Sequence, residues 1–179
     1  KACAIQAVRL IMKCLALASQ GDREAKEHMH YAVCLAGKAF TNSGLGLEHY
    51  FGHFIGSKFH IPHGRACAIV LPHVIRFNAK AASENIMDLA QVIGYTGKDY
   101  EDAASSLVSH VNDLKKRLGV AANLLEHGIS ESACNAELPN FLNDFTKAPM
   151  VPPILSNPQK CTIENMKALY NEICFDKGV

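Results

Sequence analysis

The sequence predicts an all-α protein, folded as a single domain of roughly eight helices over residues 1–179. Apolar residues recur every three or four positions through most of the chain, the spacing of one helix face. Alternating apolar and polar runs are short, and no Asn-Gly or Asp-Gly turn separates them, so strands are not expected. With 179 residues, 49% hydrophobic and 20% charged, the chain can bury a core without disulfides.

The first helices are predicted by periodicity and by residues that start or stop helices. An apolar stripe predicts a helix that ends near Gly21. Asp22 is placed to cap a second helix, which the Thr, Asn, Ser and Gly of segment 41–44 are expected to break. A third helix is expected from about Gly46 to Lys58.

The middle of the chain predicts three further helices. Pro62 fits the first turn of a fourth helix, because backbone N–H groups in a first turn have no acceptor within the helix and proline has no N–H to leave unpaired. This helix, or a pair bent at Pro72, should reach about Ala81. Segments 83–93 and 99–118 give two more, the first stopped by Gly94.

The C-terminal part predicts two helices around a proline-rich segment. A helix is expected over 130–145, with Pro139 as a kink or break. Segment 148–158 holds four prolines and is expected to be a long extended loop. Thr162 then caps a last helix that runs to about Cys174.

Charge and composition limit the classes of partner. Basic and acidic side chains number 18 and 17, a balance that predicts no nucleic-acid or membrane partner. No apolar run is expected to span a bilayer, since the longest candidate, 67–74, is broken by Pro72 and His73. The N-terminal segment is too mixed in polarity for a signal peptide. Seven cysteines without a Cys-x-x-Cys pair fit reduced thiols, and we expect a cytoplasmic protein.

Histidines carry the clearest functional signal. Five of the nine lie between His49 and His73. His49 and His53 are four residues apart and share one helix face, while His63 begins the next helix beside Gly64. Imidazoles on two rigid helix ends can converge on a metal ion, although ordinary hydrogen-bonded histidines would give the same spacing. A zinc-peptidase helix is excluded, because the residue after the first histidine is Tyr50 rather than Glu.

Three segments resemble the signature of the iron-containing alcohol dehydrogenases. They are Gly-Leu-Gly-Leu-Glu-His-Tyr-Phe-Gly-His at 44–53, His-Ile-Pro-His-Gly at 60–64 and Ile-Val-Leu-Pro-His-Val at 69–74. The fourteen-residue step from His49 to His63 is typical of that family. The resemblance extends over nearly the whole chain, including residues 36–42, 77–78 and 156–158.

The resemblance implies a role for each matching residue. His49 and His63 correspond to ligands of a divalent metal, Fe²⁺ with Zn²⁺ as the alternative. His53 corresponds to a residue that lies near the nicotinamide of NAD or NADP and takes part in proton transfer. Phe40 corresponds to an aromatic residue that lines the alcohol pocket. The implied activity is oxidation of short-chain primary alcohols, or reduction of the aldehydes, by a homo-oligomer of two or more subunits.

The chain also departs from the family pattern. Glu48, Tyr50 and Phe51 stand where smaller or neutral residues are usual, and Gln159 replaces an Arg, so pocket shape is expected to differ. The family's Asp-x-x-x-His ligand pair and its Gly-rich nucleotide-binding domain have no counterpart in residues 1–179. We therefore expect the C-terminal helical half of an enzyme, inactive alone and weak in holding metal.

Two alternatives remain open at this stage. A zinc-dependent polyol dehydrogenase or related synthase of the same superfamily would share these histidines. A helical assembly domain that keeps the histidines for packing would not be an enzyme. Cys67, one turn after His63, could approach the site, whereas His73 and the basic segment 115–117 are expected to be structural or solvated.

Overall fold

The structure is a computed structural model that describes residues 1–147 and 151–176, and these residues contain nine helices and no strand. The helices are α1 (Ala2–Ser19), α2 (Arg23–Ser43), α3 (Leu47–Phe59), α4 (His63–Asn78), α5 (Ser83–Val92), α6 (Tyr100–Arg117), α7 (Glu131–Lys147), α8 (Pro152–Leu155) and α9 (Ile163–Phe175). The predicted all-α class is confirmed.

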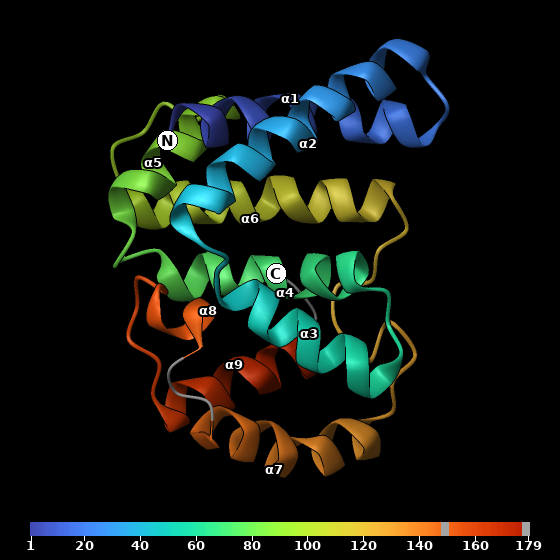
Figure 1. Ribbon diagram of the computed structural model, residues 1–179, viewed down its shortest axis with the longest axis vertical. Helices are drawn as coiled ribbons and strands as arrows, with labels where there is room; N and C mark the ends of the chain where they lie inside the picture. The colour runs from blue at the N-terminus through green and yellow to red at the C-terminus, as the bar shows by residue number, and fades with distance from the viewer. Residues whose placement is uncertain (148–150, 177–179) are drawn as a thin grey trace.

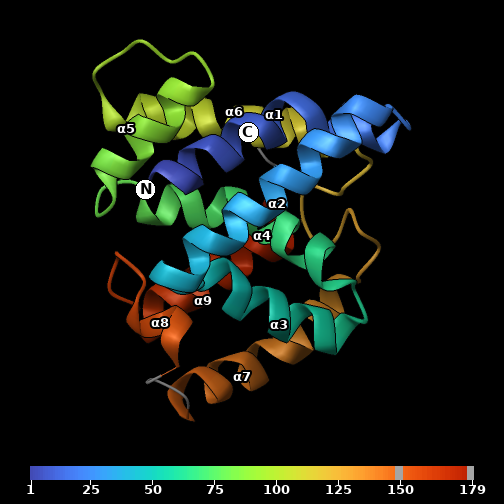
Figure 2. The ribbon, with the colours of Figure 1, turned by 45° about the horizontal axis from the view of Figure 1, so that its top comes forward.

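Helix α4 occupies the centre of the molecule. It contacts α3, α6 and α9, while α1 and α2 form a hairpin that packs against α5 and α6 through α1. Figures 1 and 2 both show α3 lying between α4 and α7. Helix α3 therefore packs against α4 with one face and against α7 with another.

Two hydrophobic cores hold these layers together. The larger one joins α3, α4, α7 and α9, and its aromatic centre is a stack of Phe51, Phe141 and Tyr170 with ring centroids 4.7 and 5.1 Å apart. The buried Tyr170 hydroxyl donates to the carbonyl oxygen of Cys134 at 3.0 Å, so its polar end is satisfied. The smaller core lies between α5 and α6.

Several predicted helix starts are confirmed by hydrogen bonds. Asp22 accepts from the backbone N–H of Ala25 at 2.7 Å, and Asp99 accepts from that of Glu101 at 2.8 Å. Thr162 and Asn165 form a reciprocal capping box at the start of α9.

The end of α2 differs from the expectation. The helix continues through Thr41, Asn42 and Ser43 and ends at Gly44, whose φ is 80°. The three side chains donate to the carbonyl oxygens four residues before them, at 2.7, 2.7 and 3.2 Å. Polar residues that usually break helices are thus accommodated by bonding back along this one.

Prolines are tolerated more widely than expected. Pro72 and Pro139 lie inside the single helices α4 and α7, and Pro62 is the N-cap of α4 rather than part of its first turn. The expectation of an extended loop over 148–158 is wrong at α8, because Pro152 and Pro153 occupy its first turn, where no N–H donor is required. Residues 148–150 of that segment lie outside the described residues.

Helix α1 corrects the expectation about apolar runs. Its 18 residues have a mean hydropathy of 1.5, enough by length and composition for a membrane span, and 17% of that window is buried. The longest apolar stretch is therefore not 67–74. Arg9 and Lys13 interrupt the run without lowering its mean hydropathy far.

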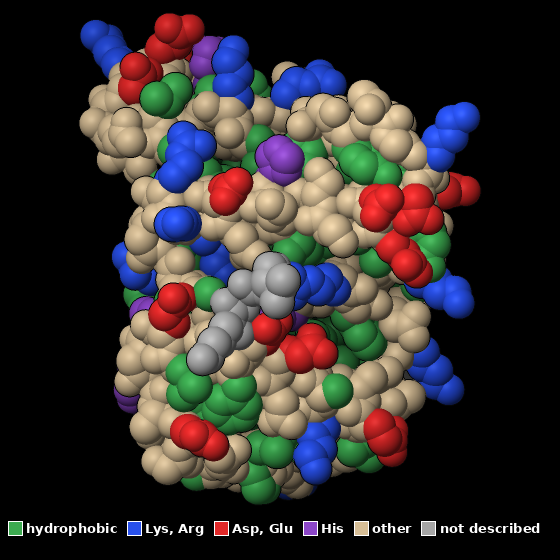
Figure 3. Space-filling model, turned by 180° about the vertical axis from the view of Figure 1, so that it is seen from behind, with side chains coloured by type: hydrophobic (Ala, Val, Ile, Leu, Met, Phe, Trp, Pro, Cys, Tyr) green, Lys and Arg blue, Asp and Glu red, His purple; other side chains and the backbone are tan. Residues whose placement is uncertain are grey.

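The basic segment at the end of α6 is only partly solvated. Lys115 is 5% exposed, and its Nζ donates to the carbonyl oxygen of Ala122 at 3.2 Å. Burial lowers the pKa of Lys115 to about 8, opposed by the nearby Glu126 carboxylate. The face seen in Figure 3 carries both basic and acidic side chains, as the balanced composition indicates.

Candidate metal centre

A short turn between α3 and α4 brings the histidines together. His60 ends α3 in the left-handed conformation, with φ of 55°, and the buried Ile61 and then Pro62 lead directly into α4. The chain therefore reverses so that the start of α4 lies against α3. His49 and His53, one turn apart on α3, face His63 in the first turn of α4.

The three imidazole rings lie close together, and His63 is near both of the others. The ring centroid of His63 lies 5.2 Å from that of His49 and 4.5 Å from that of His53, with the second pair stacked at 22°. The rings of His49 and His53 are 6.4 Å apart. His53 and His63 are exposed and His49 is half-buried, so the cluster opens to the molecular surface.

Cys67 joins this cluster. Its Sγ lies 3.6 Å from Nε2 and 3.8 Å from Nδ1 of His63. One donor atom from each of His49, His63 and Cys67 falls within 4.8 Å of the others. The structure therefore places the thiol beside two of the histidines that the sequence singles out.

Glu48 determines how His49 presents its ring. Its Oε1 lies 2.8 Å from Nδ1 of His49. Because an ionised carboxylate only accepts hydrogen bonds, Nδ1 carries the proton and the lone pair is on Nε2. A carboxylate on the distal nitrogen is the usual arrangement of a metal-binding histidine.

Protonation of the other groups follows from their surroundings. Burial lowers the pKa of His63, and the charges of His53 and His49 lower it further, so its imidazole is neutral at pH 7 and able to ligate. Burial, with the Glu48 carboxylate, raises the pKa of the Cys67 thiol to about 11, so the sulfur carries a proton until a cation displaces it.

Two residues expected to alter the pocket point elsewhere. Phe51 is fully buried and stacks on Phe141 of α7. Tyr50 packs against Phe141 and Phe145, at centroid distances of 5.9 and 6.5 Å, and burial raises the pKa of its hydroxyl to about 12. Both belong to the core between α3 and α7, and Glu48 is the departure that reaches the histidines.

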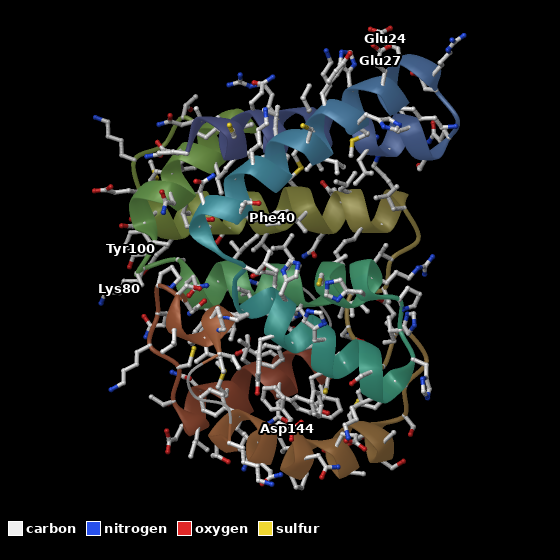
Figure 4. The ribbon with its side chains drawn as sticks, viewed as in Figure 1. Glu24, Glu27, Phe40, Lys80, Tyr100 and Asp144 are labelled. Carbon is white, nitrogen blue, oxygen red and sulfur yellow. The ribbon has the colours of Figure 1, made fainter. Side chains whose placement is uncertain are left out.

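Phe40 lies on a different helix from the histidines. It is 47% exposed in the last turn of α2, from which the chain passes through residues 44–46 into α3 (Figure 4). Its ring is accessible from solvent.

The segments 77–78 and 156–158 are structural ties. Asn78 and Asn157 exchange side-chain amide hydrogen bonds, each of 2.8 Å, and the backbone N–H of Gln159 donates to Asn78 at 3.3 Å. Ser156 Oγ lies 3.3 Å from the carbonyl oxygen of Leu45, next to the start of α3. Gln159 takes part through its backbone, so its side chain is not needed for the tie.

A large surface hollow lies apart from His49, His53 and His63. It has a volume of about 750 Å³ at the C-terminal end of α6 and is lined by Arg65, Lys115 and Glu126 among others. The cluster of His49, His53, His63 and Cys67 therefore lies at the surface of α3 and α4, outside this hollow.

Comparison with known proteins agrees with the resemblance in the sequence. A profile described as "Fe-containing alcohol dehydrogenase family, C-terminal" matches residues 1–174. The chain is 38% identical to the NADPH-dependent butanol dehydrogenase of Clostridium saccharobutylicum, covering 98% of this chain and 45% of that protein. It is 34% identical to the 1,3-propanediol dehydrogenase of Klebsiella pneumoniae, over 96% of this chain and 43% of that one.

Solved structures have the same fold. A 1,3-propanediol oxidoreductase crystal structure superimposes with a TM-score of 0.85 at 33% identity, over 97% of this chain and 44% of that one. An iron-containing alcohol dehydrogenase from Thermococcus thioreducens gives 0.83 at 30% identity, over 96% and 43%. The chain therefore spans less than half the length of the relatives it matches.

Proposed function

Because the chain belongs to the iron-containing alcohol dehydrogenase family, we propose that His49 and His63 hold the catalytic metal of an NAD(P)-linked alcohol dehydrogenase. Residues 1–179 would form its C-terminal metal and substrate domain. The observation that carries this proposal is the meeting of His49 and His63 across the α3–α4 turn, with ring centroids 5.2 Å apart.

The donor set fits a divalent cation. His63 is neutral, and Glu48 leaves Nε2 of His49 free to ligate. Imidazole suits both Fe²⁺ and Zn²⁺, and family membership favours Fe²⁺ as the resident ion. When bound, the metal supplies a Lewis acid for the alcohol oxygen, and NAD or NADP, held mainly by the rest of the enzyme, accepts the hydride.

His53 is proposed to move the proton. It is exposed to solvent, and its ring stacks on that of His63 with centroids 4.5 Å apart. From this position it would accept the alcohol proton and pass it to solvent, and family membership supports a place beside the nicotinamide.

Substrate and assembly are inferred from the relatives. Their names include a butanol dehydrogenase, a propanediol dehydrogenase and a lactaldehyde reductase, all of which point to small alcohols and aldehydes rather than to a synthase reaction. We propose short-chain primary alcohols as substrates, with Phe40 lining the pocket. We further propose a cytoplasmic homo-oligomer, a dimer or larger, without nucleic-acid or membrane partners.

Separate variants of the complete enzyme test the roles. His63→Ala should lose its metal and nearly all activity, because a direct ligand is removed. His53→Ala should keep its metal while turnover falls about 100-fold or more, the usual contribution of a proton-transfer group. Metal content by elemental analysis and alcohol-dependent NAD(P) reduction measure both. If His53→Ala loses metal as completely as His63→Ala, the division of roles is wrong.

A further inference from the structure

We propose that Cys67 is a metal ligand as well, so that this chain offers a His49, His63 and Cys67 donor set suited to a thiophilic cation such as Zn²⁺ or Cd²⁺. The proposal rests on the proposed metal-binding role of the two histidines and adds a sulfur ligand to it. It also replaces the expectation that the chain alone supplies two metal ligands.

The distances match a coordination shell. Zinc binds nitrogen at about 2.0–2.1 Å and sulfur at about 2.3 Å, so tetrahedral N and S ligands stand about 3.5 Å apart. The observed separation of Cys67 Sγ and His63 Nε2 is 3.6 Å. With all three donor atoms within 4.8 Å, small side-chain rotations complete the shell, and a fourth position stays open for water or substrate.

The backbone of α3 is shaped to admit the sulfur. Gly52 lies between His49 and His53 in sequence, and a Cβ added to it would stand 2.6 Å from Cys67 Sγ. The absence of a side chain at Gly52 therefore lets the sulfur lie directly against α3, on the side of the histidines. The space that Gly52 leaves for the sulfur is a separate observation from the distances between the donor atoms.

The other cysteines have different surroundings. All seven lie in the described part of the chain and are free thiols. Cys134 and Cys174 are buried in the larger core, and Cys34 is exposed on α2. Cys67 is the one grouped with histidine donors, at one helical turn from His63.

Sulfur changes which cation the centre prefers. The thiol releases its proton to solvent as the metal–sulfur bond forms, and the resulting thiolate is a soft ligand that favours Zn²⁺ and Cd²⁺ over Mn²⁺. The His49 and His63 imidazoles accept all of these ions. Cys67 should thus strengthen binding of thiophilic cations and leave Mn²⁺ binding nearly unchanged.

Titration of the chain with Co²⁺ tests the proposal, since a thiolate ligand gives a sulfur-to-cobalt charge-transfer band in the near ultraviolet. The unsubstituted chain should bind one Co²⁺ and show the band. Cys67→Ala and Cys67→Ser should lose the band and bind Zn²⁺ at least about tenfold more weakly, with Mn²⁺ affinity unchanged. Cys34→Ala is the matched control and should keep the band, and circular dichroism verifies folding of each variant.

The outcomes separate the two proposals. If the unsubstituted chain binds Co²⁺ without a charge-transfer band and His49→Ala weakens that binding, the histidine site stands and the sulfur ligand is overturned. If Cys67→Ala retains the band or the full Zn²⁺ affinity, the sulfur ligand is likewise overturned. If neither His49→Ala nor His63→Ala affects binding of any of the ions, the proposed metal site itself fails.

Discussion

At His49 a single hydrogen bond decides which ring nitrogen faces the site. Glu48 precedes His49 in the first turn of α3, and its Oε1 accepts from the Nδ1–H of His49, with Oε1 and Nδ1 2.8 Å apart. Neighbouring side chains on a helix usually diverge, so this contact could not be predicted from the sequence. The sequence indicated Glu48 only as an unusual residue for the family.

Replacing Glu48 should weaken metal binding without removing a ligand. Glu48→Ala leaves the tautomer of His49 unfixed, and loss of such a partner costs about 10–100-fold in metal affinity. Calorimetric titration with Zn²⁺ measures the change. Glu131→Ala, which also removes a glutamate from a first helical turn, is the control and should bind as before.

Unlike His49, which lies at the candidate metal site, His73 is a buried structural imidazole. It is 2% exposed, and burial lowers its pKa to about 4, with the cations of Lys115 and Arg76 adding to the effect and Asp176 opposing it. Its Nδ1 lies 4.0 Å from the Glu172 carboxylate, beyond hydrogen-bonding distance.

This shift predicts that stability falls in mild acid. Between pH 6.5 and about 4 the unfolded chain binds a proton at His73 that the folded chain does not, so stability present above pH 6.5 is lost as pH falls. At pH 5 the loss should be about 2 kcal/mol relative to pH 7.5. Urea unfolding at both pH values measures it.

A variant isolates the contribution of His73. In His73→Gln the difference in unfolding free energy between the two pH values should shrink by about the same amount. In His110→Gln, which changes an exposed histidine of α6, the difference in unfolding free energy between the two pH values should be unchanged. An unchanged pH dependence in the His73 variant would contradict the assignment.

At the scale of the helices, residues that act locally were the predictable ones. Asp22 and Thr162 were predicted to cap helices, and the structure confirms both through hydrogen bonds to backbone N–H groups three residues away. Asp99 caps α6 in the same way, although the sequence predicted only the helix there. Side-chain direction depends on which neighbour each helix meets. Tyr50 and Phe51 lie beside His49 in sequence but face α7. The helical period puts Phe51 on a different face from His49, but it does not say which helix packs against that face.

The contact between α3 and α4 can be tested at Gly52. Gly52→Ala would place a Cβ 2.6 Å from Cys67 Sγ, so we expect a loss of about 1–3 kcal/mol in unfolding free energy. The double variant with Cys67→Ala should recover most of this loss, because the clashing atom is removed. Denaturant unfolding of the two single variants and the double variant gives the coupling energy.

Gly37→Ala provides the control for helix propensity. No atom lies within 4 Å of a Cβ added at Gly37 in α2, so the substitution should stabilise the chain by about 0.5–1 kcal/mol. Equal effects of alanine at positions 37 and 52 would show that the close approach of α4 has no energetic consequence.

At the scale of the whole molecule, the all-α class followed from periodicity, while the arrangement of layers did not. The larger core joins α3 and α4 to α7 and α9, which are more than fifty residues further along the chain. Amphipathic helices specify a buried face without specifying its partner. The same limit applies to the α1–α2 hairpin: both helices were predicted, but the packing of α1 on α5 and α6 was not.

The three-residue turn at His60 has a consequence for the order in which the molecule forms. It confines every proposed metal-binding side chain to residues 49–67, so the centre closes a short loop at little entropic cost. Local structure of this kind forms early, and domains emerge N-terminus first during synthesis. The proposed ligands therefore all precede α7, α8 and α9 in the order of synthesis, and none of those three helices supplies one of them.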